Sequence, residues 1–169
     1  MKIVLIGFMG SGKTTVGKIL ASKLSTQFVD TDEYIENALN KKISDIFKDE
    51  GESYFRQMET KAIGKICDSK EDLVISVGGG LPVLPINREI MADNCEVFYL
   101  RAETDTLLKR LEGDNTRPLL KGDNLRDKIV RLFGEREAIY NEAAPYKIDT
   151  DGCMPEEIAD IIIKILQAK

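Results

Sequence analysis

The stretch GFMGSGKTT, residues 7–15, decides the fold class of this chain. Its glycines, Lys13 and Thr14 match the pattern G-x-x-x-x-G-K-[S/T], between an apolar strand-like run at 2–6 and a helical pattern from residue 13. Glycines let backbone N–H groups converge on phosphate oxygens, and the N-terminus of the following helix adds partial positive charge. The stretch predicts a nucleotide phosphate-binding loop in which Lys13 reaches the β- and γ-phosphates and Thr14 ligates Mg²⁺.

Strand and helix patterns alternate along the whole chain. Apolar runs typical of parallel strands lie at 2–6, 73–77 and 96–100, with shorter candidates at 28–29 and 147–149. Helical patterns lie at roughly 13–24, 32–40, 52–68, 103–111, 124–142 and 155–167. This alternation predicts one α/β domain over 1–169, with a five-stranded parallel sheet covered by helices on both faces in three layers. The polar stretch 112–123 is either a surface loop or a lid.

Composition restricts the class of function. The 169 residues carry a net charge of −5, which weighs against a broad nucleic-acid surface but not against a small anionic ligand. There is no histidine, which removes His-based acid–base chemistry and most zinc sites. The three scattered cysteines fit buried thiols in a reducing cytoplasm. Because no run resembles a membrane span or a signal peptide, we expect a cytoplasmic protein without a membrane or nucleic-acid partner.

Two aspartates follow the predicted second strand, in the stretch FVDTDEYI. Parallel sheets bind ligands at the carboxyl ends of their strands, so Asp30 and Asp32 are expected on the same edge as the phosphate loop. One carboxylate would face the water shell of a metal ion and the other an acceptor hydroxyl. The alternative is structural, because Thr31 or Asp32 could simply cap the helix that follows.

Three arginines and a run of glycines are ambiguous when taken singly. Arg56 and Arg136 lie in helical patterns, where arginine is usually solvated or ion-paired, and Glu59 is a possible partner of Arg56. Arg117 lies in the polar stretch 112–123. In VISVGGGLP, residues 74–82, glycine follows the strand where many phosphate-loop proteins carry an acidic residue that helps to hold Mg²⁺.

Six segments in register resemble the shikimate kinase family, a relative of the nucleoside monophosphate kinases. The segments are GFMGSGKTTVGKILA, FVDTDEYIE, ISDIFKDEGESYFRQMET, VISVGGGLP, RPLL and EREAIY, and the similarity runs from about residue 3 to residue 150. The resemblance implies a P-loop kinase fold with a short lid. It also implies transfer of a phosphoryl group from ATP to the 3-hydroxyl of shikimate, which gives shikimate 3-phosphate for aromatic amino acid synthesis through chorismate.

The resemblance also implies roles for individual residues, with an acceptor region at about 31–60 and a lid at about 112–123. The implied ATP-binding residues are Gly10, Ser11, Gly12, Lys13, Thr14, Thr15, Arg110 and Arg117. Mg²⁺ would be held by Thr14 and, through water, by Asp30. Asp32 would bind the shikimate hydroxyls as the candidate base, with Lys13 and Arg117 as the other catalytic residues.

The remaining implied residues surround the acceptor. Arg56 and Arg136 would clamp the shikimate carboxylate, because the planar guanidinium fork binds a carboxylate bidentately. Gly78, Gly79 and Gly80 would form the floor of the acceptor site, where backbone N–H groups approach the ligand with no side chain in the way.

Three alternatives remain beside this interpretation. A kinase of another small acceptor, such as gluconate or a nucleoside monophosphate, would share the fold. A GTPase switch would need an N-K-x-D stretch that the sequence lacks, and DTDG at 149–152 lies too near the C-terminus to be its D-x-x-G element. A family member that has lost catalysis is the third alternative. A kinase of this size with one complete site is expected to work as a monomer.

Overall fold

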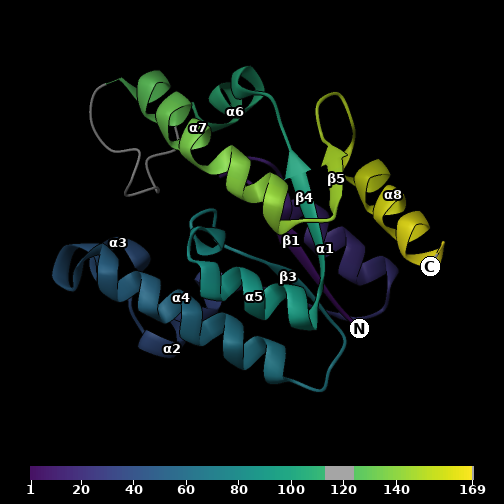
Figure 1. Ribbon diagram of the computed structural model, residues 1–169, viewed down its shortest axis with the longest axis horizontal. Helices are drawn as coiled ribbons and strands as arrows, with labels where there is room; N and C mark the ends of the chain where they lie inside the picture. Colours follow the sequence, from purple (N-terminus) through teal and green to yellow (C-terminus); the bar gives the residue numbers. More distant parts are fainter. Residues whose placement is uncertain (113–123, 169) are drawn as a thin grey trace.

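The computed structural model describes residues 1–112 and 124–168, and a parallel five-stranded sheet lies at its centre (Figure 1). The strands are β1 (Lys2–Ile6), β2 (Gln27–Asp30), β3 (Leu73–Ser76), β4 (Glu96–Arg101) and β5 (Tyr146–Asp149). Their order across the sheet is β2-β3-β1-β4-β5, and every neighbouring pair is parallel. The predicted five-stranded parallel sheet is therefore confirmed.

Helices connect successive strands. They are α1 (Lys13–Lys23), α2 (Thr31–Leu39), α3 (Ile43–Asp49), α4 (Gly51–Asp68), α5 (Pro85–Asn94), α6 (Thr104–Leu111), α7 (Leu125–Ala143) and α8 (Pro155–Gln167), with a 3-10 turn η1 (Leu81–Val83). Each predicted helix and strand is present, and its ends differ from the prediction by at most one residue. The sequence patterns predict neither α3 nor α5. Within residues 1–112 and 124–168, no helix has the length and apolar character needed to cross a membrane.

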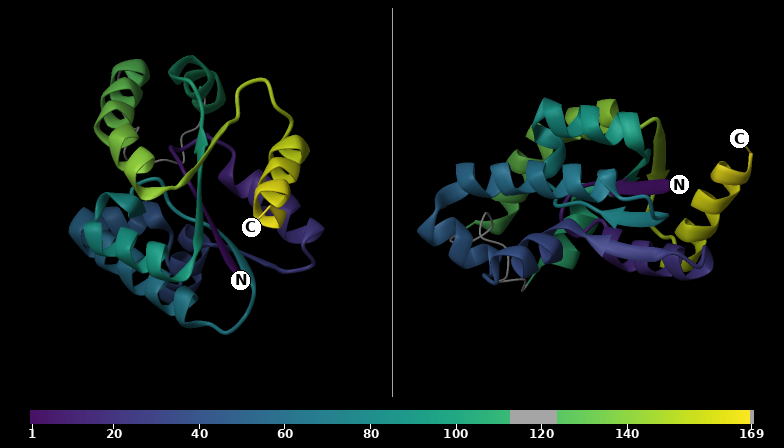
Figure 2. Two further views of the ribbon diagram at one scale, coloured as in Figure 1. Left: turned by 45° about the vertical axis from the view of Figure 1, so that its right-hand side comes forward. Right: turned by 90° about the horizontal axis from the view of Figure 1, so that it is seen from below.

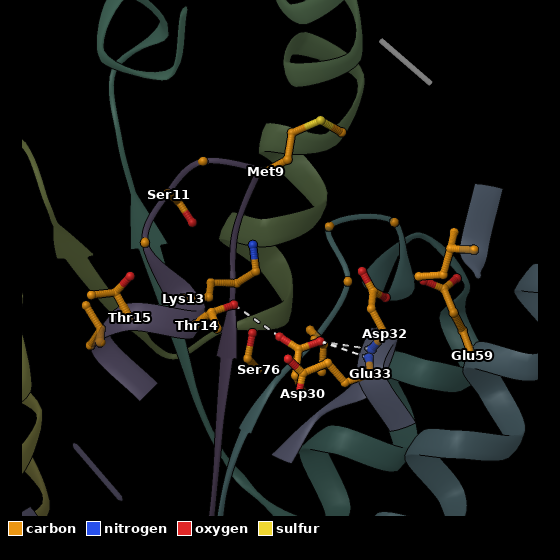
Figure 3. Close-up of a pocket in the computed structure, with 18 of the residues that line it drawn as sticks. Met9, Ser11, Lys13, Thr14, Thr15, Asp30, Asp32, Glu33, Glu59 and Ser76 are labelled. Carbon is orange, nitrogen blue, oxygen red and sulfur yellow. Dashed lines mark hydrogen bonds between the residues drawn. The ribbon is translucent and has the colours of Figure 1, made fainter. Parts of the chain in front are cut away.

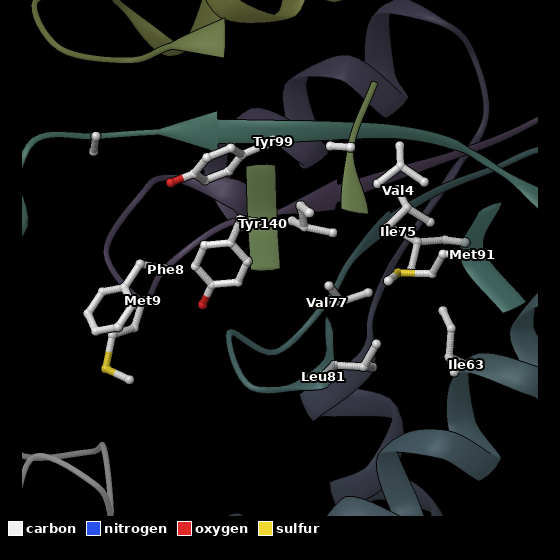
Figure 4. Close-up of a cluster of buried hydrophobic side chains, with 14 of the residues drawn as sticks. Val4, Phe8, Met9, Ile63, Ile75, Val77, Leu81, Met91, Tyr99 and Tyr140 are labelled. Carbon is white, nitrogen blue, oxygen red and sulfur yellow. The ribbon is translucent and has the colours of Figure 1, made fainter. Parts of the chain in front are cut away.

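Helices cover both faces of the sheet, as the left view of Figure 2 shows. Alternate residues of β1 face opposite sides, because successive side chains of a strand point to opposite faces. Ile3 and Leu5 belong to the core cluster that α1 and α8 complete. Val4 and Ile6 belong to the cluster formed with α4, α5, α6 and α7 (Figure 4). These two apolar layers, one on each side of the sheet, confirm the predicted three-layer arrangement.

The carboxyl ends of the strands position the chemically important segments. Because all strands are parallel, the segments that follow them emerge at one edge of the sheet. The phosphate-loop sequence 7–14 follows the central strand β1, the two aspartates follow β2, and the three glycines follow β3. The order of the strands therefore places these segments side by side, although they are up to about 70 residues apart in sequence.

Candidate active site

One pocket of about 1020 Å³ lies at this edge of the sheet (Figure 3). Its lining contains every described residue that the sequence analysis assigns to the site: Gly10, Ser11, Gly12, Lys13, Thr14, Thr15, Asp30, Asp32, Arg56, Gly78, Gly79, Gly80, Arg110 and Arg136. Arg117 and nearly all of the predicted lid lie outside the described residues. The segments that resemble a kinase site thus form one continuous cavity.

The phosphate loop runs directly from β1 into the N-terminus of α1. Gly12 caps this helix with a φ of 95°, a left-handed conformation that favours glycine. The first backbone N–H groups of a helix have no acceptor within it, so those of α1 are available to an anion. The Lys13 ammonium is buried and donates to the carbonyls of Gly7 (2.9 Å) and Phe8 (3.0 Å). The loop therefore gathers backbone donors and one positive charge at one end of the pocket.

Thr14 and Asp30 meet beside this loop. The Thr14 hydroxyl donates to Asp30 Oδ2 at 3.1 Å, while Asp30 Oδ1 accepts from the backbone N–H groups of Asp32 (3.0 Å) and Glu33 (3.4 Å). Asp30 is thus the N-cap of α2, so neither Thr31 nor Asp32 has the capping role considered above. Capping fixes the Asp30 carboxylate and leaves the Asp32 side chain to enter the pocket, between the phosphate loop and Glu59 (Figure 3).

The Thr14–Asp30 pair suits a hard cation. A hydroxyl oxygen and a carboxylate are groups that Mg²⁺ prefers, and these two are held together by the 3.1 Å hydrogen bond from Thr14 to Asp30. The described residues contain no cluster of three or more acidic, cysteine or histidine side chains that could hold a metal without other ligands. Substrate phosphates and water would therefore have to complete the coordination, as is usual for Mg²⁺ in kinases.

Two arginines lie at the other end of the pocket. Arg136, on α7, is only 7% exposed, and its Nη1 is buried without a hydrogen-bond partner among the described residues. Leaving a buried charged donor unsatisfied is costly, so this atom indicates a missing anionic partner. Arg56, on α4, donates to Glu59 Oε2 at 2.6 Å and to Glu52 Oε1 at 2.9 Å.

Glu59 is a residue of the pocket that the sequence analysis treats only as a possible ion-pair partner. Its side chain is 1% exposed, and burial raises its pKa from 4.5 to about 7, an effect that Arg56 partly offsets. In the sequence, the spacing of three residues between Arg56 and Glu59 indicates an ion pair, but it does not indicate a place in the pocket. The ion pair exists, but it lies inside the pocket instead of on a solvated surface.

The glycine turn after β3 makes room for these side chains. A Cβ atom on Gly80 would lie 2.2 Å from Arg56 Nη1, and one on Gly78 would lie 2.7 Å from Asp32 Oδ1. The Gly78 N–H group bonds to Thr31 Oγ1 at 3.0 Å, so it does not face a ligand as expected for all three glycines. The absence of side chains here lets Arg56 and Asp32 lie directly against the backbone.

The pocket also contains residues that the sequence analysis does not identify. Arg110, on α6, donates to the Gly10 carbonyl at 3.1 Å. The same pocket is lined by Thr150, Cys153, Pro155 and Ile158, which follow β5 or lie in the first turn of α8. No residue type in that segment distinguishes it in the sequence, and only the order of the strands brings it to the pocket.

The pKa of Glu59 predicts a pH-dependent stability. An acid whose folded pKa lies above its unfolded value binds a proton more tightly when folded, so the free energy of unfolding falls as pH rises from 4.5 to about 7. For a full shift this component is on the order of 3 kcal/mol. Glu59→Gln should remove this component. In urea denaturation, the free energy of unfolding should therefore fall less between pH 5 and pH 8 in the variant than in the wild type. Exposed Glu135→Gln is the control, and parallel pH profiles for wild type and Glu59→Gln would contradict the prediction.

Comparison with known proteins places this architecture in a family. The family model described as shikimate kinase matches residues 9–167. A shikimate kinase of Persephonella marina is 46% identical over 95% of this chain and 96% of its own length. One from Sulfurihydrogenibium sp. is 47% identical over 95% of each chain. A solved shikimate kinase of Acinetobacter baumannii in complex with shikimate has a TM-score of 0.95 and 35% identity, covering 99% of this chain and 93% of its own. This chain belongs to the shikimate kinase family.

Proposed function

We propose that this protein transfers the γ-phosphoryl group of ATP to the 3-hydroxyl of shikimate, giving ADP and shikimate 3-phosphate. The observation that carries the acceptor assignment is the buried Arg136, whose Nη1 lacks a partner and lines the pocket together with Arg56. Two arginines at the far end from the phosphate loop suit an acceptor that is itself a carboxylate. Gluconate would share that charge, but the family and the solved complex of a relative with shikimate favour the cyclic acceptor.

Mg²⁺ is the proposed cofactor, held by Thr14 directly and by Asp30 through water. The hydrogen bond from Thr14 to Asp30 is the observation that fits this ion, because it leaves lone pairs of the Thr14 oxygen for direct ligation and places the Asp30 carboxylate where it could accept from metal-bound water. When bound, Mg²⁺ neutralises charge on the β- and γ-phosphates during transfer. The backbone donors of the phosphate loop and Lys13 would bind the same phosphates, with Thr15 and Ser11 beside them.

Asp32 is the proposed base and orienting group. It lies between the phosphate loop and Glu59, the ion-pair partner of Arg56 (Figure 3). An acceptor whose carboxylate is bound by the arginines would therefore present a hydroxyl to Asp32 and to the γ-phosphate together. Most of the rate enhancement would come from this alignment and from charge stabilisation, because phosphoryl transfer needs little covalent help from the protein. Arg110 is proposed to contact the adenine end, and Arg117 to add charge from the lid by resemblance alone.

A single chain would be sufficient for this reaction. We propose a monomer, because the phosphate loop, the two aspartates and the two arginines of one chain already line a common pocket, and analytical ultracentrifugation would test it. A dimer or larger oligomer that loses activity when it dissociates would contradict the proposal.

The direct test is an acceptor panel. ADP release from ATP and Mg²⁺ would be measured with shikimate, gluconate, AMP or no acceptor, and the product would be identified by ³¹P NMR. Stimulation by shikimate with appearance of a phosphate monoester is the expected result. Stimulation by gluconate or AMP instead would support kinase activity but contradict the assignment of shikimate as the acceptor. ATP binding without stimulation by any acceptor would indicate a member of the family that has lost catalysis.

A further inference from the structure

Tyr140 contacts the turn that carries the three glycines. It lies on α7, one helical turn after Arg136, and its side chain is fully buried. Its hydroxyl donates to the Gly79 carbonyl at 2.5 Å. Figure 4 shows this hydroxyl pointing toward the turn between Val77 and Leu81. Gly79 lines the pocket, and the same tyrosine hydroxyl also interacts with the guanidinium of Arg136, which lines it too.

This hydrogen bond determines which way one peptide group faces. The Gly79 carbonyl and the Gly80 N–H belong to the same peptide bond, and the structure contains no cis peptide among its described residues. In a planar trans peptide the C=O and the N–H point in opposite directions. Because Tyr140 binds the Gly79 carbonyl, the Gly80 N–H is directed away from Tyr140, and Gly80 lines the pocket. The reverse orientation would place a carbonyl oxygen against an anionic acceptor.

We propose that Tyr140 is a positioning residue for the acceptor, which keeps the Gly79–Gly80 peptide oriented so that its N–H group serves the substrate. The proposal rests on the proposed function, since it assumes an anionic acceptor beside Arg56 and Arg136. Helix α7 would then supply both the Arg136 guanidinium that binds the acceptor and the Tyr140 hydroxyl that orients the Gly80 N–H group. Burial raises the pKa of Tyr140 to about 12, so the hydroxyl stays protonated and able to donate throughout the range of a kinase assay.

Tyr99 provides a matched control. Its ring lies 5.3 Å from that of Tyr140, and it is just as buried. Its hydroxyl has no hydrogen-bond partner among the described residues. Tyr99→Phe and Tyr140→Phe therefore remove the same atom from neighbouring core positions, but only the second removes the bond to Gly79 and the contact with Arg136.

Steady-state kinetics of the two variants test the proposal. Tyr140→Phe should raise the KM for shikimate about 5- to 30-fold, the range expected for a lost hydrogen bond that leaves a buried carbonyl unpaired. The KM for ATP should stay within about twofold, and Tyr99→Phe should leave both constants near the wild-type values. An unchanged KM for shikimate in Tyr140→Phe, or equal effects in the two variants, would overturn the proposal. A wild-type enzyme that ignores shikimate would refute the proposed function itself, and this inference with it.

A second feature lies at the opposite edge of the sheet. Cys67, in the last turn of α4, and Cys95, between α5 and β4, place their Sγ atoms 3.6 Å apart. Cys67 is 5% exposed, while Cys95 is partly exposed and accessible to a small reagent. A hydrogen bond with Cys95 lowers the pKa of Cys67 despite burial, and Lys2 adds to this effect.

We infer that these two thiols form a disulfide when they meet a low-molecular-weight disulfide such as oxidised glutathione. One thiolate attacks the reagent and releases one reduced thiol; the second thiolate then displaces the other. The protein loses two protons and two electrons, and the reagent is reduced to two thiols. The new bond would join the ends of α4 and α5, far from the pocket at the carboxyl edge, so it would stabilise the fold without changing the site.

Oxidation followed by mass spectrometry and calorimetry tests this inference. After oxidation, the mass of the non-reduced protein should be lower by two hydrogen atoms. Only Cys153 should then react with an alkylating reagent. Its Tm should rise by about 5–10 °C, as a loop of this length predicts, and dithiothreitol should reverse the change. Cys67→Ser and Cys95→Ser should abolish the shift. A stable glutathione adduct, three remaining free thiols, or a disulfide without a higher Tm would overturn the inference.

Discussion

Replacement of Asp32 by Asn is expected to lower kcat with shikimate by about 100-fold or more, while the Kd for ATP stays within about twofold. The substitution preserves the shape of the side chain, which lies against Gly78 where any Cβ would clash. It removes the negative charge and the capacity to take a proton from the acceptor hydroxyl. It leaves the phosphate loop and the Thr14–Asp30 pair intact, because Asp30 bonds to the backbone N–H of Asp32 and not to its side chain.

Steady-state turnover and calorimetric titration with ATP measure the two halves of this expectation. Asp93→Asn is the matched control, because it makes the same change at an exposed position near the end of α5 that does not line the pocket. If Asp32→Asn turned over at the wild-type rate, Asp32 would have no part in the mechanism. If ATP affinity fell as far as turnover, Asp32 would act on the nucleotide and not on the acceptor.

The parts of the site that the sequence predicts well are those encoded locally. The phosphate loop needs only a strand, glycines and a helix start in succession, so Lys13 and Thr14 were predictable without tertiary contacts. Asp30 and Asp32 were predictable because all parallel strands end at one edge. Arg56 and Arg136 were different: helical arginines are usually solvated, and only the resemblance of six segments distinguished them.

The two helices that the sequence patterns miss lack a clear apolar period. α3 has only seven residues, too few to repeat a pattern. α5 begins at Pro85 and buries Asn87 together with Met91. The Asn87 side chain donates to the Leu81 carbonyl at 2.8 Å, so a polar residue occupies a core position and hides the periodicity. Tertiary hydrogen bonding, which a residue pattern does not encode, replaces apolar contact there.

The glycine turn shows a further limit of sequence reasoning. Three glycines after a strand indicate close approach of some group, and the expectation was that a ligand approaches the backbone. The structure shows that side chains of the protein use the same space, because Cβ atoms on Gly80 and Gly78 would clash with Arg56 and Asp32. This second reason for glycine depends on the packing of α4 and α2 against the turn, and residue spacing does not determine that packing.

Replacement of Arg136 by Met is expected to weaken shikimate binding by about 2–4 kcal/mol, or about 30- to 1000-fold in Kd. The same substitution should leave the Tm unchanged or raise it. Without acceptor, Arg136 is a 7% exposed cation whose Nη1 has no hydrogen-bond partner among the described residues, so the fold is destabilised by burying it. Loss of binding without loss of stability would separate a functional residue from a structural one.

The methyl ester of shikimate tests whether the acceptor carboxylate is the group that Arg136 binds. In the wild type the ester should bind far more weakly than the acid, whereas this preference should be much smaller in Arg136→Met, because the variant keeps only Arg56 as a partner of the charge. Arg131→Met is the control, since that arginine lies on the same helix with a side chain that is 72% exposed. If Arg136→Met still preferred the acid as strongly as the wild type does, Arg56 alone would bind the carboxylate. The buried Arg136 would then need a different anionic partner, such as a transferred phosphoryl group.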